Sequence, residues 1–209
     1  MQACAGPIIE STIEIYQEIS KQLRPTPARF HYLFNLRDVA KVIQGILMTR
    51  PQSIQNADSM QKLWVHEASR IFYDRLINDT DKEWFTTIVC ELLSRSFRSG
   101  LEFDDVFGEK KVIFSDIIKV AAEASVILYE EMKDPNKLKK VLTEKLEDYN
   151  ISASNRMSLV FFEDAIHHIC RILRVLRQPR GNVMLIGVGG SGKQSLTRLS
   201  SFVYEQTVR

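Results

Sequence analysis

Residues 183–196 read VMLIGVGGSGKQSL, and they predict a strand, a tight loop and a helix in immediate succession. The apolar run 183–186 has the length and composition of a buried strand. The next seven residues, 187–193, match the first seven positions of the phosphate-binding pattern G-x-x-x-x-G-K-[ST], and residues 193–205 have helical periodicity. A strand before the loop and a helix after it are the context in which this pattern binds phosphate.

Each residue type in the loop suits contact with a phosphate group. Glycines adopt positive φ and let backbone N–H groups curve around an anion without Cβ clashes. The N-terminus of the following helix adds partial positive charge, and the Lys193 ammonium would reach the β- and γ-phosphates of a nucleotide. The alternative interpretation is a glycine-rich turn that binds nothing. We expect ATP or ADP to contact Gly187, Val188, Gly189, Gly190, Ser191, Gly192, Lys193, Gln194 and Ser195.

The eighth position of the pattern bears on Mg²⁺ binding. It is normally Ser or Thr, whose hydroxyl ligates the ion, but here it is Gln194, and Ser195 follows one residue later. A glutamine carbonyl is an oxygen donor, yet it is longer and less well placed than a hydroxyl. Phosphate binding is therefore better supported by the sequence than hydrolysis, and Mg²⁺ is expected only together with a nucleotide.

Hydrolysis also requires an acidic residue at the end of a second strand and a group that activates water. The string LVFFED, residues 159–164, has apolar residues followed by two acids, but we reject it as this acidic motif. Its apolar period continues through Ile166, Ile169 and Ile172, which predicts one face of a helix over 155–177, and it precedes the loop. We expect no catalytic residue in this sequence.

The rest of the sequence favours a mainly α fold with a helical bundle. An amphipathic helix is expected over 8–23, with Ile9, Ile13, Tyr16 and Leu23 on its apolar face. A second is expected over 36–48, where Asn35 and Asp38 have the spacing of a capping box. Only 9 glycines and 6 prolines occur in 209 residues, too few turn-formers for an all-β sandwich. We place the boundary between two regions near residues 133 and 134.

Charge and cysteine content exclude several classes of protein. The 28 Lys and Arg residues and 26 Asp and Glu residues leave a net charge of +2, which gives no electrostatic reason to expect nucleic-acid or membrane partners. Three distant cysteines do not indicate a disulfide framework. His167 and His168 are adjacent on a predicted helix and point about 100° apart, so they are not expected to share a metal ion.

Four strings in the sequence resemble the axonemal branch of the dynein heavy chains, and they extend over nearly the whole chain. They are longer and more specific than a lone phosphate-binding loop. The strings are PTPARFHYLFNLRD (25–38) with VIQGI (42–46), LWVHE (63–67) with RIFYDRL (70–76), FFEDAIHHICRI (161–172) and GVGGSGKQSL (187–196).

The resemblance implies a piece of a motor ring built from six AAA+ modules in one polypeptide. Residues 1–133 would hold the helical lid that ends the third module, and residues 134–209 would open the fourth module with its first strand, P-loop and helix. Arg37 would match the lid arginine that contacts nucleotide phosphates, known as sensor 2; the other interpretation is an ion pair with a nearby carboxylate. The implied partners are neighbouring AAA+ modules, microtubules, and dynein intermediate, light intermediate and light chains. The implied location is the cytoplasm and cytoskeleton, in the axoneme of a cilium.

Two functions remain open at this point. The first is an ATP-binding portion of a minus-end-directed microtubule motor ATPase that drives ciliary movement, itself inactive in hydrolysis because the second acidic motif is missing. The second is a non-catalytic interaction or assembly module in which the P-loop is structural. A small independent kinase is not favoured, because such enzymes carry the loop near the start of the chain.

Overall fold

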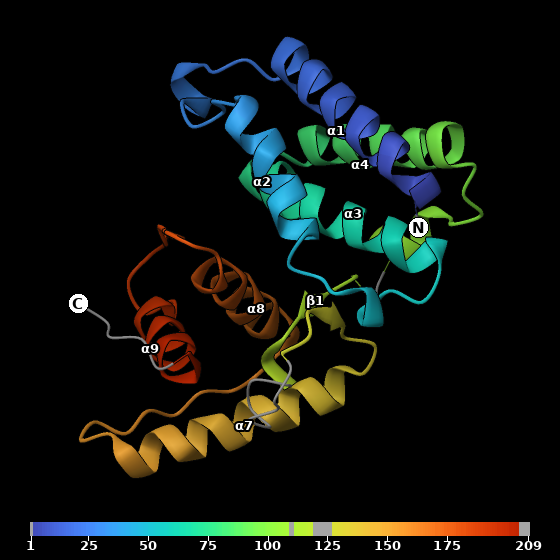
Figure 1. Ribbon diagram of the computed structural model, residues 1–209. Coiled ribbons are helices and arrows are strands. Elements are labelled where there is room, and N and C mark those ends of the chain that lie inside the picture. Colours follow the sequence, from blue (N-terminus) through green and yellow to red (C-terminus); the bar gives the residue numbers. More distant parts are fainter. Residues whose placement is uncertain (1, 109–110, 119–126, 205–209) are drawn as a thin grey trace. The chain divides into compact units, whose positions relative to one another are not determined.

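The computed structural model describes residues 2–108, 111–118 and 127–204 and divides the chain into two compact units, Met1–Val112 and Ile113–Arg209. Figure 1 shows that helices make up most of both units, which confirms the prediction of a mainly α fold. The division after Val112 separates two compactly packed units, and it lies about twenty residues before the expected module boundary. The boundary at residues 133 and 134 stays a prediction.

The first unit is a bundle of helices joined by short 3₁₀ turns. Helix α1 lies against α4, and α2 packs on α3 (Figure 1). The core between them contains the large apolar side chains of Trp64, Phe72 and Phe85, all fully buried. The elements are α1 (Gln2–Gln22), η1 (Pro27–Arg29), α2 (Leu36–Ile46), η2 (Pro51–Ser53), α3 (Ala57–Ile71), η3 (Tyr73–Arg75), α4 (Asp79–Phe97) and α5 (Phe103–Phe107).

The buried face of α1 differs in part from the expected one, since Leu23, just after the helix, is buried as expected. Ile9 and Ile13 are 51% and 41% exposed, whereas Ile15 and Ile19 are completely buried. The buried stripe includes Thr12, whose hydroxyl donates to the Ile8 carbonyl oxygen at 2.6 Å and accepts from the Trp64 indole at 3.0 Å. A polar residue therefore completes the core-facing stripe, and apolar periodicity alone selected the neighbouring face.

The capping box predicted for α2 is confirmed. Asn35 accepts a hydrogen bond from the backbone N–H of Arg37, and the Asp38 carboxylate accepts from the backbone N–H of Asn35 at 3.0 Å. Two of the N–H groups that a helix start leaves without partners are thus satisfied locally. The short spacing of these residues makes such a cap readable from sequence.

In its described residues, 113–118 and 127–204, the second unit contains a short antiparallel strand pair and three helices. β1 (Phe114–Ser115) pairs with β2 (Glu130–Glu131), with Phe114 opposite Glu131. Helices α7 (Pro135–Ser152), α8 (Glu163–Arg177) and α9 (Lys193–Val203) follow, and α9 packs on both α7 and α8. Their shared core includes Leu142, Leu173 and Leu199, each completely buried.

Two local predictions for the second unit are wrong. Residues 155–162 form no helix, because α8 begins at Glu163. The helical reason given for rejecting residues 159–164 as an acidic motif therefore does not hold for residues 159–162. Residues 183–186 form no strand, and Met184 and Ile186 are 81% and 83% exposed. A strand requires neighbouring strands for its backbone groups, and no described segment pairs with this run.

Candidate functional site

The glycine-rich loop has the backbone that its residue types predict. Gly190 and Gly192 have φ of +77° and +78°, in the left-handed region that costs residues with a Cβ about 1–2 kcal/mol. Gly192 is the N-cap of α9, and its carbonyl oxygen accepts the Leu196 N–H at 2.9 Å. At Gly187 a Cβ would stand 3.3 Å from the Ser191 hydroxyl. The loop is therefore a tight turn that leads directly into a helix N-terminus.

Lys193 is the first residue of α9, and its side chain turns back over the loop. Its ammonium donates to the carbonyl oxygens of Gly187 at 2.7 Å and Val188 at 2.6 Å, and to the Ser191 hydroxyl at 3.0 Å. These are all three protons of the ammonium. The loop thus holds a positive charge beside the α9 N-terminus, where the helix dipole also favours an anion.

Helix α9 holds this loop on the core of the second unit. Leu196 and Leu199 are buried against α7 and α8, while Gln194 on the other side of the helix is exposed. Ser195 is half-buried. The residues fit a phosphate ligand, since positive-φ glycines, a lysine and a helix N-terminus converge here. They fit Mg²⁺ less well, because Gln194 occupies the position where the usual hydroxyl ligand stands.

Arg37 lies in the first unit, at the start of α2. Its side chain is exposed and forms no ion pair with any carboxylate in the described residues. The alternative expected from the sequence, a carboxylate pair, is therefore not formed within this unit. Arg37 and the phosphate loop lie in different compact units of the chain.

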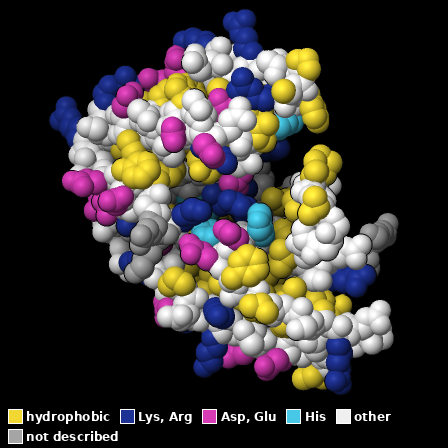
Figure 2. All heavy atoms as spheres, turned by 180° about the vertical axis from the view of Figure 1, so that it is seen from behind, with side chains coloured by type: hydrophobic (Ala, Val, Ile, Leu, Met, Phe, Trp, Pro, Cys, Tyr) yellow, Lys and Arg dark blue, Asp and Glu magenta, His cyan; other side chains and the backbone are white. Residues whose placement is uncertain are grey.

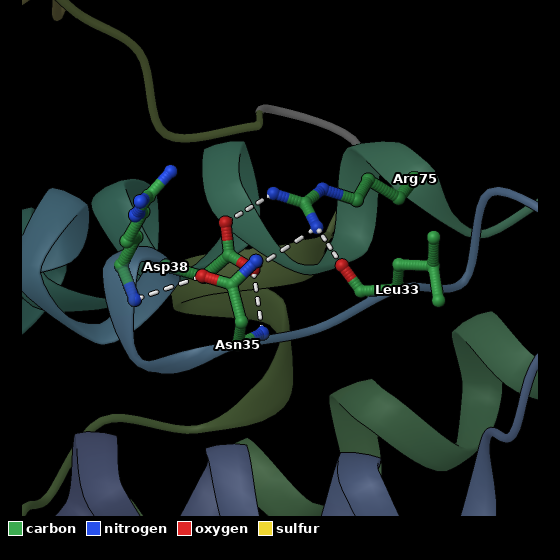
Figure 3. Close-up of polar contacts among 5 residues, drawn as sticks. Leu33, Asn35, Asp38 and Arg75 are labelled. Carbon is green, nitrogen blue, oxygen red and sulfur yellow. Dashed lines mark hydrogen bonds and ion pairs between the residues drawn. The ribbon is translucent and has the colours of Figure 1, made fainter.

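The N-terminus of α2 beside Arg37 is held by a polar cluster that sequence reasoning missed. Arg75 pairs with Asp38 through Nη2 and Oδ1, and Arg75 Nη1 donates to Asp38 Oδ2 and to the Leu33 carbonyl oxygen, both at 3.1 Å (Figure 3). Asp38 is 2% exposed. Figure 3 shows Asp38 between Asn35 and Arg75, so one carboxylate both caps the helix and receives the guanidinium.

A second ion pair holds the segment that precedes α2. Arg29 Nη1 donates to Asp81 Oδ2 at 2.7 Å, and the Tyr32 hydroxyl donates to the same oxygen at 3.0 Å. The Tyr32 oxygen in turn accepts the Ile77 N–H at 2.9 Å. Burial, with the Asp81 carboxylate adding to it, raises the pKa of Tyr32, so this donor stays protonated. Residues 49 to 52 positions apart make these contacts, and no local spacing could have indicated them.

Exposed apolar residues occur close to both candidate sites. Phe30, Leu33 and Leu36 are 73%, 64% and 72% exposed in the first unit, and Val188 in the phosphate loop is 79% exposed. Figure 2 shows hydrophobic side chains, in yellow, scattered among charged ones over the face that it presents.

Among the residues that the structure describes, no group of three His, Cys, Asp or Glu side chains could hold a metal ion. No helix in the described ranges is long and apolar enough to cross a membrane.

Two family models match the chain, one in each compact unit. A model of the AAA+ lid domain matches residues 8–109, and a model of the P-loop containing dynein motor region D4 matches residues 157–209. The first covers the helical bundle with Arg37, and the second covers α8, the phosphate loop and α9. Both models describe AAA+ or dynein motor regions, the family that the sequence strings resemble.

Curated relatives extend this similarity along the chain. It is 45% identical over 199 residues to the human dynein axonemal heavy chain 6, and 43% identical over 199 residues to the rat dynein axonemal heavy chain 1. It is 42% identical over 201 residues to the Chlamydomonas reinhardtii dynein-1-beta heavy chain of the flagellar inner arm I1 complex. Each alignment covers 95% of this chain but only 4–5% of the relative. The chain therefore belongs to the axonemal dynein heavy-chain family, of which it represents a short segment with an AAA+ lid and a dynein P-loop.

Proposed function

We propose that this segment binds ATP or ADP through the loop Gly187–Ser195, with Lys193 as the main charged contact. The observation that carries the proposal is the convergence of the Lys193 ammonium, two left-handed glycines and the α9 N-terminus on one turn. Backbone N–H groups and a cation there are complementary to phosphate oxygens. The match to a P-loop dynein motor region supports a nucleotide as the ligand.

Nucleotide binding would require Lys193 to exchange partners. The ammonium now donates to the Gly187 and Val188 carbonyl oxygens. A phosphate oxygen would replace at least one of them, and a charged acceptor makes a stronger hydrogen bond than a neutral carbonyl. Bound Mg²⁺ would neutralise phosphate charge in the usual way. Ser195 or the Gln194 carbonyl would face it in place of the missing hydroxyl.

In the intact heavy chain we assign the segment to two consecutive AAA+ modules. Residues 1–133 form the lid of the third module, in which Arg37 contacts nucleotide phosphates as sensor 2, and residues 134–209 open the fourth. The parent protein is then a minus-end-directed microtubule motor ATPase of the ciliary axoneme, a cytoplasmic and cytoskeletal protein. Its partners are neighbouring modules, microtubules and the intermediate, light intermediate and light chains. The names of the relatives, which are axonemal and flagellar heavy chains, support this placement.

The competing idea, an assembly module with a purely structural P-loop, is not favoured. The loop matches a family model of a motor region, and the Lys193 ammonium is accessible from solvent at a helix N-terminus. The parent's hydrolysis is assigned to residues outside this segment, since no acidic motif at a second strand is expected within it.

Titration with a fluorescent ATP analogue tests the binding proposal. We expect saturable binding by the wild-type chain and loss of binding in Lys193→Ala. The matched control is Lys140→Ala, which removes an ammonium from α7 whose side chain is 79% exposed and 4.0 Å from Glu144. Equal affinity in the Lys193→Ala and Lys140→Ala variants would contradict the proposal.

A further inference from the structure

A buried carboxylate joins three separate segments of the second unit. Asp116 follows β1 and is 3% exposed. Its Oδ2 receives Arg177 Nη1, and its Oδ1 accepts the Tyr204 hydroxyl at 2.5 Å. The Arg177 guanidinium also lies over the ring of buried Tyr129, 5.7 Å from its centroid. We call Asp116, Arg177 and Tyr204 the α9 anchor.

The anchor contacts the C-terminal end of α9, opposite to the end that carries the phosphate loop. Arg177 is the last residue of α8, and Tyr204 directly follows α9. Lys193 begins the same helix. At 1.5 Å per residue, the 11 residues of α9 separate the loop from Tyr204 by about 16 Å. A helix this short moves as one body, so fixing its C-terminal end limits how its N-terminal end can be placed.

The charges of the anchor favour this attachment strongly. A buried carboxylate with one partner removed costs several kcal/mol, so Asp116 requires both donors to stay in place. Burial, and then the neighbouring Asp116 charge, raise the pKa of Tyr204, which keeps its hydroxyl protonated as a donor. The ring of Tyr204 also packs with the core of the second unit. Residues 61 and 88 positions apart are thereby tied together.

We propose that the Asp116–Arg177–Tyr204 anchor positions α9, and through it the phosphate loop, in the geometry that accepts a nucleotide. The inference rests on the proposed nucleotide binding at Lys193. If anchor formation favours the binding geometry, then nucleotide binding favours the anchor by the same free energy, because linkage is reciprocal. Arg177 and Tyr204 are therefore positioning residues, and neither needs to touch the ligand.

The variant Tyr204→Phe tests the anchor with the loss of one oxygen atom. Asp116 keeps Arg177, so the chain is expected to fold. The matched control is Tyr149→Phe, since Tyr149 also packs on α9, with its ring 5.4 Å from that of Phe202. We expect the dissociation constant for the ATP analogue to rise about fivefold or more in Tyr204→Phe, the lower end of typical coupling between sites. Tyr149→Phe is expected to bind like the wild type.

Hydrogen exchange without nucleotide gives a second, independent readout. We expect faster exchange of amides in Gly187–Val203 in Tyr204→Phe than in Tyr149→Phe, and no difference between the variants in α4 of the first unit. Unchanged exchange overturns the proposal whether or not the chain binds nucleotide. If the wild type does not bind the ATP analogue, the proposed function fails; if it binds and Tyr204→Phe binds equally well, the anchor proposal alone fails.

Discussion

Arg75 and Asp38, 37 residues apart in the sequence, form a two-point ion pair at the start of α2. The same Asp38 carboxylate accepts the Asn35 N–H, and Arg75 lies 5.3 Å from the centroid of the Phe34 ring. The pair therefore connects the helix that carries Arg37 with the turn η3 after α3.

Replacing Arg75 by alanine is expected to destabilise the first unit by about 3 kcal/mol, because it leaves a buried carboxylate without its charged partner. The Arg75 side chain is 28% exposed, which places the expected value at the low end of the range for buried pairs. Denaturation by urea, followed by tryptophan fluorescence, measures the change. Arg37→Ala is the control, and its free energy of unfolding is expected to stay within about 0.5 kcal/mol of the wild type. Similar losses in both variants would show that the pair contributes nothing specific.

Thr12 offers a test of the polar residue in the buried stripe of α1. Thr12→Val keeps the shape but leaves the Trp64 indole N–H without its acceptor at 3.0 Å. An unsatisfied buried donor costs about 1–3 kcal/mol, and we expect a loss of that size in the free energy of unfolding. Thr12→Ser retains the hydroxyl and is expected to lose less. If valine were as stable as threonine at this position, the hydrogen bond would not explain why a polar side chain lies in the core.

Local patterns predicted those features whose partners are close in sequence. The Asn35 and Asp38 cap and the positive-φ loop at Gly190 both depend on neighbours within a few residues. The expected strand at 183–186 depends on distant segments for its hydrogen bonds, and the structure provides none among the described residues. The sequence pattern of residues 115–132 also predicts a helix, but Ser115 belongs to β1 and Glu130 and Glu131 form β2. Residues 119–126 lie outside the described residues.

In the candidate sites too, residues with partners close in sequence were predictable, and residues with distant partners were not. Every loop residue from Gly187 to Ser195 was identified from one contiguous pattern, and the loop geometry is compatible with it. The residues that hold the sites in place, such as Asp81 for the segment before α2 and Asp116 for α9, contact partners 49 or more positions away. Single-sequence periodicity carries no signal for such pairs, because a buried aspartate and a solvated one have the same local neighbours.

Substitution by alanine can distinguish a loop glycine with positive φ from one without it. Gly190→Ala places a Cβ on a backbone with φ of +77°, which is expected to cost about 1–2 kcal/mol and to weaken ATP-analogue binding about five- to thirtyfold. Gly189 has no atom within 4 Å of an added Cβ and no positive φ. Gly189→Ala is therefore the control, with a smaller expected loss of affinity. Fluorescence titration of both variants measures their affinities for the ATP analogue. Equal losses of affinity would mean that backbone conformation does not limit binding.

The raised pKa of Tyr204 predicts how the stability of the chain depends on pH. Its pKa in the folded chain lies above the ordinary value of 10.0, mainly because of burial, with Asp116 adding to the shift. Above that ordinary value the unfolded chain loses the Tyr204 proton while the folded chain keeps it, so the folded state binds more protons and stability falls as pH rises. The contribution of Tyr204 is thus present in full below about pH 10 and decreases progressively above it.

Urea denaturation between pH 8 and pH 11 measures this dependence, with Tyr204→Phe and Tyr149→Phe compared with the wild type. Tyr32 titrates in the same direction in the first unit and is present in all three chains, so it cancels in the comparison. We expect Tyr204→Phe to be less stable than the wild type at pH 8, because the Asp116 contact is lost, and the difference to narrow toward pH 11 as the wild type loses the contribution of Tyr204. A difference that stays constant over this range would mean that the Tyr204 hydroxyl ionises alike in the folded and unfolded chains.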